Sequence, residues 1–142
     1  MTININCPHC GVKNRIPEER IADSPKCGRC KEAIFTGKPL AATDANWSNL
    51  VLECDVPVIV DCWAAWCGPC KAFAPVFEEA AAQLEPRYRL VKLDTESNPV
   101  MANKLGIRSI PTLIVFKGGK ELTRQSGAMP LNSFLQWAKN LG

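Results

Sequence analysis

Six of the eight cysteines in this chain of 142 residues form three pairs, each with two residues between its members. The pairs are Cys7 and Cys10, Cys27 and Cys30, and Cys67 and Cys70. A thiolate is both a nucleophile toward disulfides and a ligand for metal ions, and this spacing suits either chemistry. The residues around each pair must therefore decide which chemistry it serves.

The third pair lies where an apolar run gives way to a helical pattern. Residues 56–63 are typical of a strand buried on both faces, and residues 68–84 repeat apolar side chains at helical spacing. Cys67 is therefore expected at or just before a helix N-terminus, where free N–H groups and the helix dipole favour a thiolate. We expect Cys67 to attack a disulfide and Cys70, one turn later, to resolve the mixed disulfide. A zinc knuckle or a structural disulfide is the alternative for this pair.

The first two pairs are separated by sixteen residues, which is the spacing of a four-cysteine zinc ribbon. Cys7, Cys10, Cys27 and Cys30 would occupy every position around one structural Zn²⁺, whose binding would supply folding free energy that the few apolar residues of this segment cannot. His9 is a spare candidate ligand that we expect at the surface or beside the ligands. Two disulfides are the alternative for these cysteines.

Composition indicates an ordinary globular protein with two modules. We expect a zinc-ribbon-like N-terminal module over residues 1–37 and a larger domain over residues 38–142, with Gly37 and Pro39 marking the boundary. The first 40 residues hold seven Lys/Arg against four Asp/Glu, and the rest of the chain holds ten of each. We see no secretory signal and no apolar run long enough to span a membrane, so we expect a cytoplasmic protein in which cysteines bind metal or carry out redox catalysis.

The larger domain is expected to be α/β, with a mixed central sheet flanked by helices on both faces. A first strand should end near Ala42, and Asp44 should cap a short helix that runs through Leu52. The helix over residues 68–84 should bend at Pro75. The remaining elements are expected as a strand at 88–94, a helix at 99–105 ended by Gly106, a hairpin of 112–117 and 121–126 around Gly118 and Gly119, and a helix at 130–141.

Residues 40–142 resemble the thioredoxin family. The segment from Val60 to Lys71, which reads VDCWAAWCGPCK, is nearly the whole family signature, and the match continues through Lys92-Leu93-Asp94, Asn98-Pro99, residues 106–112 and Gly127-Ala128. The resemblance implies a thioredoxin fold and a protein-disulfide reductase that receives electrons from an NADPH-dependent thioredoxin reductase. It implies disulfide-containing client proteins, no tightly bound organic cofactor, and a monomer.

The resemblance also assigns roles to individual residues. Asp61 matches the buried carboxylate that exchanges a proton with the resolving thiol, and its apolar neighbours alone predict a raised pKa; a solvated strand-end carboxylate is the alternative. Lys92 matches a lysine near that carboxylate and would temper the shift, and Pro111 matches a cis-proline that faces the disulfide. The patch that docks clients would comprise Trp66, Gly68, Pro69, Gly106, Ile110, Pro111, Gly127 and Ala128.

Cys54 and Cys62 depart from the family pattern, and we expect both to be inert, with redox regulation of Cys62 as the alternative. The N-terminal extension resembles that of the thioredoxin 2 type, which suggests a role in the oxidative-stress response. A zinc-dependent redox sensor and a client-binding or holdase module are the alternatives for that segment. Nucleic-acid binding is a third and weaker alternative, because its basic residues have little aromatic interleaving and fit a solvated face: Lys13, Arg15, Arg20, Lys26, Arg29 and Lys31.

Overall fold

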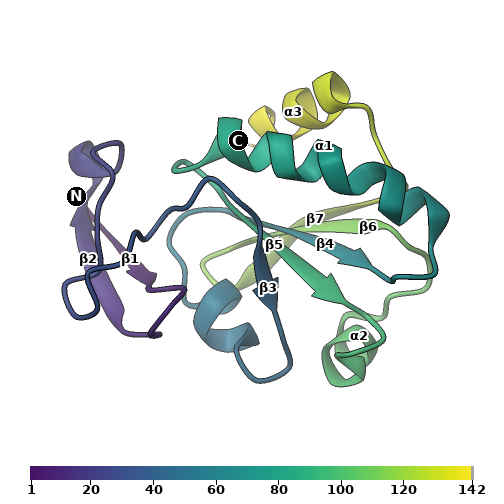
Figure 1. Ribbon diagram of the computed structural model, residues 1–142, viewed down its shortest axis with the longest axis horizontal. Coiled ribbons are helices and arrows are strands. Elements are labelled where there is room, and N and C mark those ends of the chain that lie inside the picture. The colour runs from purple at the N-terminus through teal and green to yellow at the C-terminus, as the bar shows by residue number, and fades with distance from the viewer. Residues whose placement is uncertain (142) are drawn as a thin grey trace.

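The computed structural model describes residues 1–141, and within that part of the chain a five-stranded mixed sheet lies between helices on its two faces. Helices α1 (Gly68–Leu84) and α3 (Leu131–Lys139) cover one face. Helix α2 (Pro99–Leu105) and the π-helical turn η2 (Ser48–Leu52) lie on the other (Figure 1). The α/β architecture expected from the sequence is confirmed.

The order of strands in this sheet is β3 (Leu40–Ala42), β5 (Arg89–Asp94), β4 (Val58–Trp63), β6 (Thr112–Lys117) and β7 (Lys120–Ser126). Strands β3, β5 and β4 are parallel, and β6 and β7 are antiparallel to their neighbours. Asp61 is in register with Lys92 of β5 and with Leu113 of β6. Strand β4 is therefore central, and it carries the chain directly toward the third cysteine pair.

Strand β4 is apolar on both faces because both faces of the sheet are covered. Val58, Val60 and Cys62 belong to the cluster on the η2 side, whereas Ile59 packs with Phe73 and other residues of the α1 side. Successive side chains alternate between faces, so Asp61 points to the same side as Ile59, toward the α1 layer. The continuous apolar run thus places one carboxylate inside the core.

Helix α1 is anchored by a cluster of aromatic rings that it shares with α3. Phe134 packs edge-on against Phe73, with ring centroids 5.5 Å apart, and lies 5.8 Å from the ring of Phe77. Pro75 lies inside the helix, which nonetheless continues from Gly68 to Leu84, so the proline does not break it. Rigid packing of α1 fixes the position of its N-terminus, where the cysteine pair lies.

The short helix expected from Asp44 to Leu52 is only partly correct, because the chain turns at residues 44–46 before the π-helical turn η2. Asp44 does not cap this turn. Its carboxylate accepts a hydrogen bond from the backbone N–H of Met101 in α2 at 2.8 Å, and its own N–H donates to Asn98 Oδ1 at 3.0 Å. Gly106 ends α2 in the left-handed conformation, with φ of 64°, as expected.

The N-terminal module contains an antiparallel hairpin of β1 (Thr2–Asn6) and β2 (Lys13–Pro17), followed by the 3₁₀ turn η1 (Glu18–Arg20). These two strands were not expected from the sequence. The hairpin does not stand alone, because Ile5 and Ile16 share one hydrophobic cluster with Leu50 of η2 and the adjoining face of the main sheet. The module is thus packed onto the larger domain.

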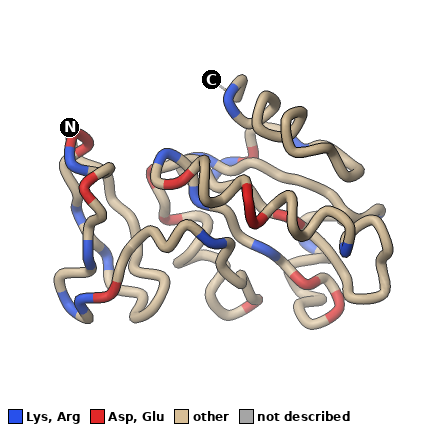
Figure 2. Tube along the Cα trace, turned by 45° about the horizontal axis from the view of Figure 1, so that its top comes forward, with Lys and Arg blue, Asp and Glu red and all other residues tan. Residues whose placement is uncertain are grey.

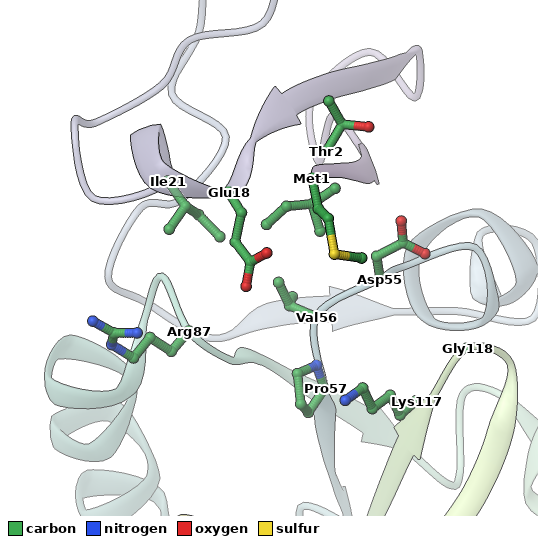
Figure 3. A pocket seen from close by; sticks show the side chains of 11 residues that line it. Met1, Thr2, Glu18, Ile21, Asp55, Val56, Pro57, Arg87, Lys117 and Gly118 are labelled. Atoms are coloured by element: carbon green, nitrogen blue, oxygen red, sulfur yellow. The ribbon is translucent and has the colours of Figure 1, made fainter.

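Beside this hydrophobic cluster, one side of the interface between module and domain is polar and partly open. Asn4 and Asp55 bond to each other twice, through Asn4 N–H to Asp55 Oδ2 at 2.7 Å and Asp55 N–H to Asn4 O at 3.1 Å. Beside them is a cavity of about 480 Å³, whose wall combines Glu18 of the module with Arg87 and Lys117 of the domain (Figure 3). No helix within residues 1–141 is both long enough and apolar enough to cross a membrane.

Candidate active site and metal site

Cys67 occupies the N-cap position of α1, as the sequence predicts. Its Sγ accepts a hydrogen bond from the backbone N–H of Cys70 at 3.1 Å, and the two residues are joined by a disulfide with a Cα–Cα distance of 5.2 Å. Gly68 and Pro69 form the first helical turn between them and are exposed. When the disulfide is reduced, the free amides and the dipole of α1 favour the thiolate of Cys67.

Asp61 lies in the interior of the domain with no exposed surface. Neither carboxylate oxygen has a hydrogen-bond partner among the residues that the structure describes. Burial raises the pKa of Asp61 to about 7, and the positive charge of Lys92 opposes this rise. A carboxyl group that titrates near neutral pH can accept and return a proton under physiological conditions.

Lys92 is the register partner of Asp61 on β5, but its ammonium group is directed to an aromatic ring. Its Nζ lies 4.8 Å from the ring centroid of Trp63. No ion pair joins Lys92 to Asp61 within residues 1–141, and the Lys92 ammonium makes a cation–π contact with Trp63. Lys92 therefore acts on the carboxylate through its electric field.

Apolar and backbone groups surround the disulfide on the side facing solvent. Cys67 Sγ lies 3.8 Å from the carbonyl oxygen of Ile110, and the Ile110–Pro111 peptide bond is cis, as expected. The N–H of Gly127 donates to the carbonyl of Pro111 at 2.8 Å, and the exposed Ala128 follows it. The structure thus brings these residues together around Cys67.

Trp66 presents the largest exposed aromatic surface beside the disulfide, with 68% of the residue accessible. Its Nε1–H donates to Glu96 Oε1 at 3.0 Å, a partner that the sequence analysis missed. Trp66 and Ile110 line a shared groove of about 240 Å³. Gly106 is exposed at the end of α2, and residues 107–110, which follow it directly, line this groove.

The four N-terminal cysteines converge, with their sulfur atoms all within 4.8 Å of one another. The distances from Cys7 Sγ to Cys30 Sγ and from Cys10 Sγ to Cys27 Sγ are both 3.6 Å. A tetrahedral zinc–thiolate centre with Zn–S bonds of about 2.3 Å has sulfur atoms about 3.8 Å apart, so this cluster fits the ion. His9 is exposed and does not belong to the cluster.

The two halves of this cluster have the same hydrogen-bond pattern. Amides of His9 and Cys10 donate to Cys7 Sγ, and the amide of Arg29 donates to Cys27 Sγ. The backbone N–H of Cys30, followed by the Asn14 side chain, lowers the pKa of the Cys27 thiol to about 5. These donors favour the deprotonated form of Cys27 that a metal ion requires, whereas burial and the three neighbouring cysteines raise the pKa of the Cys30 thiol to about 12.

Cys54 and Cys62 are buried in the cluster on the η2 side of the sheet. Burial raises the pKa of both thiols, that of Cys62 to about 12. Both side chains are therefore neutral and shielded at neutral pH, a state in which a thiol is a poor nucleophile.

Arg89 and Asn6 are buried polar residues that the sequence analysis missed. Nη2 of Arg89 donates to the carbonyl of Asn6 at 3.0 Å, and Nη1 donates to the carbonyl of Leu50 at 3.3 Å. The sequence signal that could have indicated a buried Arg89 was its position at the start of an apolar strand. Its neighbours gave no indication of the N-terminal segment that it contacts.

Charged residues of the N-terminal module are distributed over its surface. Figure 2 shows that its lysines and arginines lie along the hairpin and the loops at both ends, with acidic residues among them. Arg20 and Asp23, for example, form an exposed pair at 3.8 Å. The basic residues are thus interspersed with acidic ones.

Comparison with known families gives two matches in the same chain. Residues 38–140 match the thioredoxin family model, and residues 6–32 match the model for the N-terminal zinc ribbon of thioredoxin 2.

Named relatives agree with these matches. Thioredoxin C-3 of Corynebacterium nephridii is 43% identical over 133 residues, which cover 94% of this chain and 91% of that protein. The M-type chloroplastic thioredoxin of Chlamydomonas reinhardtii is 40% identical over 85% of this chain and 89% of its own. Thioredoxin 1 of a Nostoc species is 49% identical over 66% and 88%, respectively. The chain therefore belongs to the thioredoxin family of thiol–disulfide oxidoreductases, and it carries the N-terminal cysteine module of the thioredoxin 2 type.

Proposed function

We propose that the chain reduces disulfides of client proteins, with Cys67 as the nucleophile and Cys70 as the resolving thiol. The observation that carries this proposal is the Cys67–Cys70 disulfide at the N-terminus of α1, with the Cys70 N–H directed at Cys67 Sγ. That N–H and the helix dipole stabilise negative charge on Cys67 rather than on Cys70. Cys67 therefore attacks first.

The reaction proceeds in two exchanges that together move two electrons to the client. The Cys67 thiolate bonds to one client sulfur, and the client disulfide breaks to release the other sulfur as a thiolate. Cys70 then loses its proton to the Asp61 carboxylate and attacks Cys67 Sγ. This second step frees the remaining client thiolate and leaves the Cys67–Cys70 disulfide, while Lys92 tunes the proton affinity of Asp61.

Client proteins would dock on the surface around the disulfide. The exposed indole of Trp66, the Ile110 side chain and the backbone at Pro111 suit an extended, partly apolar segment. The remaining members of this proposed patch are Gly68, Pro69, Gly106, Gly127 and Ala128. Electrons would return to the oxidised protein from NADPH through a thioredoxin reductase, with the chain acting as a monomer.

The test is a comparison of single-cysteine variants in reductase-coupled reduction of a protein disulfide. Cys67→Ser should abolish turnover, and Cys70→Ser should accumulate mixed disulfides that a second thiol releases. Cys54→Ala, which alters a buried thiol away from α1, serves as the matched control and should retain turnover. Full activity of Cys67→Ser would refute the proposal.

We further propose that Cys7, Cys10, Cys27 and Cys30 hold one structural zinc ion. Bound zinc would join the two knuckles and contribute folding free energy to the module. Metal analysis of protein purified under reducing conditions should find about one zinc per chain, as four thiolate ligands require. A metal-free protein with four reactive N-terminal thiols would refute this site.

A second role for the module, as a sensor of oxidants, is favoured by the unequal exposure of its ligands. Cys10 is exposed and Cys30 is half-buried, whereas Cys7 and Cys27 are buried. Oxidation would begin at Cys10 and release the metal. The holdase alternative predicts client binding by the module itself, and protein lacking residues 1–37 would lose that binding while its catalytic cysteines remain.

We also propose that the protein acts in the cytoplasm, in redox homeostasis and in the response to oxidative stress. A reduced compartment preserves zinc–thiolate centres and supplies NADPH-linked reductants. Fractionation of cells that produce the full chain would test this location. Recovery from an oxidising compartment would contradict it.

A further inference from the structure

The interface between the N-terminal module and the domain contains a positive charge that the redox chemistry does not use. Arg89 is fully buried at the start of β5, and its guanidinium lies between the carbonyls of Asn6 and Leu50. A guanidinium stays protonated in proteins, and a buried charge is costly unless an opposite charge or hydrogen bonds compensate it. Two carbonyl bonds satisfy only part of this group, because Nε has no partner among residues 1–141.

No carboxylate forms an ion pair with Arg89 within residues 1–141. Burial lowers the pKa of Arg89, and the neighbouring groups that raise it are Cys54, Glu85 and Cys7. Burial raises the pKa of Cys54, so that thiol is neutral at neutral pH. The Glu85 carboxylate is already engaged, since it accepts the Gly37 N–H at 2.9 Å.

Cys7 differs from these two groups because it belongs to the four-cysteine cluster. It directly follows Asn6, whose carbonyl accepts the Arg89 hydrogen bond. One Zn²⁺ held by four thiolates has a net charge of about −2, and this charge persists over the whole neutral pH range. Metal binding would thus create a lasting anion that begins one residue after Asn6, the hydrogen-bond acceptor of the buried guanidinium.

We propose that Arg89 is a positioning residue that provides the buried countercharge for the zinc–thiolate centre and so couples metal binding to docking of the N-terminal module on the domain. This inference rests on the zinc site proposed above.

The contacts around Arg89 explain how the coupling would reach the domain. The side-chain amide of Asn6 donates to the Asn49 carbonyl at 2.8 Å, and the Asn49 amide donates to the Gly11 carbonyl at 3.0 Å, directly after the first knuckle. Gly11, Asn49, Asn6 and Arg89 therefore connect the metal site to η2 and to the first residue of β5. Loss of the metal would leave Arg89 as an uncompensated buried cation and weaken this connection.

The experiment compares zinc affinity in the full chain by competition with a chromophoric chelator. Arg89→Gln removes the charge and retains a hydrogen-bond donor. We expect its zinc affinity to fall about 10-fold, the lower end of the cost of losing an outer-shell partner, because Arg89 bonds to the residue before a ligand and not to the ligand itself. Arg89→Lys keeps the charge and should hold zinc nearly as tightly as the original protein. Arg87→Gln changes an exposed arginine two residues away and is the matched control.

A second measurement separates this role from simple structural support. Urea unfolding with and without zinc should show that Arg89→Gln destabilises the zinc-bound protein more than the zinc-free protein, because the countercharge matters only when the metal is present. A structural role would lower both stabilities equally and leave zinc affinity unchanged. Labelling of the buried Cys54 thiol, followed by mass spectrometry, would report undocking of the module.

The outcomes distinguish the two proposals. If the original chain binds zinc and Arg89→Gln binds it equally well, the countercharge inference is overturned while the zinc site stands. If the original chain binds no zinc, both are overturned. If Arg89→Gln does not fold, Arg89→Lys decides: retained zinc affinity supports the inference, and a tenfold or greater loss overturns it.

Discussion

Replacing Asp61 by asparagine should stabilise the protein at alkaline pH and have little effect in acid. The carboxylate is fully buried without a hydrogen-bond partner among the described residues, and burial raises its pKa from 3.8 to about 7. In the unfolded chain the same group ionises near pH 4. Asp61→Asn keeps the shape and removes the ionisation.

The sign and size follow from proton linkage. Between about pH 4 and pH 7, the folded state binds a proton on Asp61 that the unfolded state has lost, so the free energy of unfolding falls as pH rises. Each unit of pKa difference corresponds to about 1.36 kcal/mol, so the full loss is about 4 kcal/mol above pH 7. Asp61→Asn should therefore be more stable than the original protein by about 4 kcal/mol near pH 8.5, with the advantage declining to zero near pH 4.

Urea unfolding of the oxidised protein across this pH range measures the difference directly. Comparing the two proteins at each pH cancels the contributions of other titrating groups, including the zinc-binding thiols. Asp23→Asn alters a carboxylate whose side chain is 66% exposed and should change stability by less than about 0.5 kcal/mol. A pH-independent difference, or a less stable Asp61→Asn protein at alkaline pH, would refute the assignment of a buried, ionisable carboxylate.

Three further predictions concern the metal and the local conformation of the chain. Removing zinc with a chelator under reducing conditions should expose the four ligand thiols to a thiol reagent and lower the unfolding temperature, whereas unchanged labelling would contradict a bound metal. Asp44→Ala should cost about 1 kcal/mol in urea unfolding, because the Met101 N–H loses its acceptor. Gly106→Ala should lower the free energy of unfolding by about 1 kcal/mol, because alanine is strained at a φ of 64°. Crowding does not contribute, since no atom lies within 4 Å of an added Cβ. Gly68→Ala is the control, because Gly68 is equally uncrowded and has no positive φ, so this substitution should lack the penalty.

Local sequence patterns correctly predicted those elements that depend on neighbouring residues along the chain. The apolar run of β4, the helical spacing in α1 and the left-handed Gly106 each result from short stretches of sequence, and the structure confirms them. The knuckles could likewise be found from spacing alone, and their sulfur atoms do converge. These features depend on neighbours along the chain, which a single sequence displays.

Features that depend on distant partners could not be predicted. Asp44 bonds to Met101, 57 residues away, so an expectation based on its own turn was wrong. Arg89 contacts Asn6 at a separation of 83 residues, and a buried arginine has no local signature. The β1–β2 hairpin is stabilised by packing on η2 and the main sheet, which its short apolar stretches did not reveal.

The parallel register of β4 and β5 has a practical consequence for attaching the protein to a surface. The module contacts the first residues of these strands, whereas Cys67 lies beyond their far ends, so a strand of six residues separates them (Figure 1). At about 3.3 Å per residue this is about 20 Å. Met1 is 97% exposed on the module, so a tether attached there would hold the molecule by the end away from its reactive disulfide (Figure 1). Immobilisation through the N-terminus should therefore give a uniform reducing surface, whereas random coupling through lysines would block part of the population.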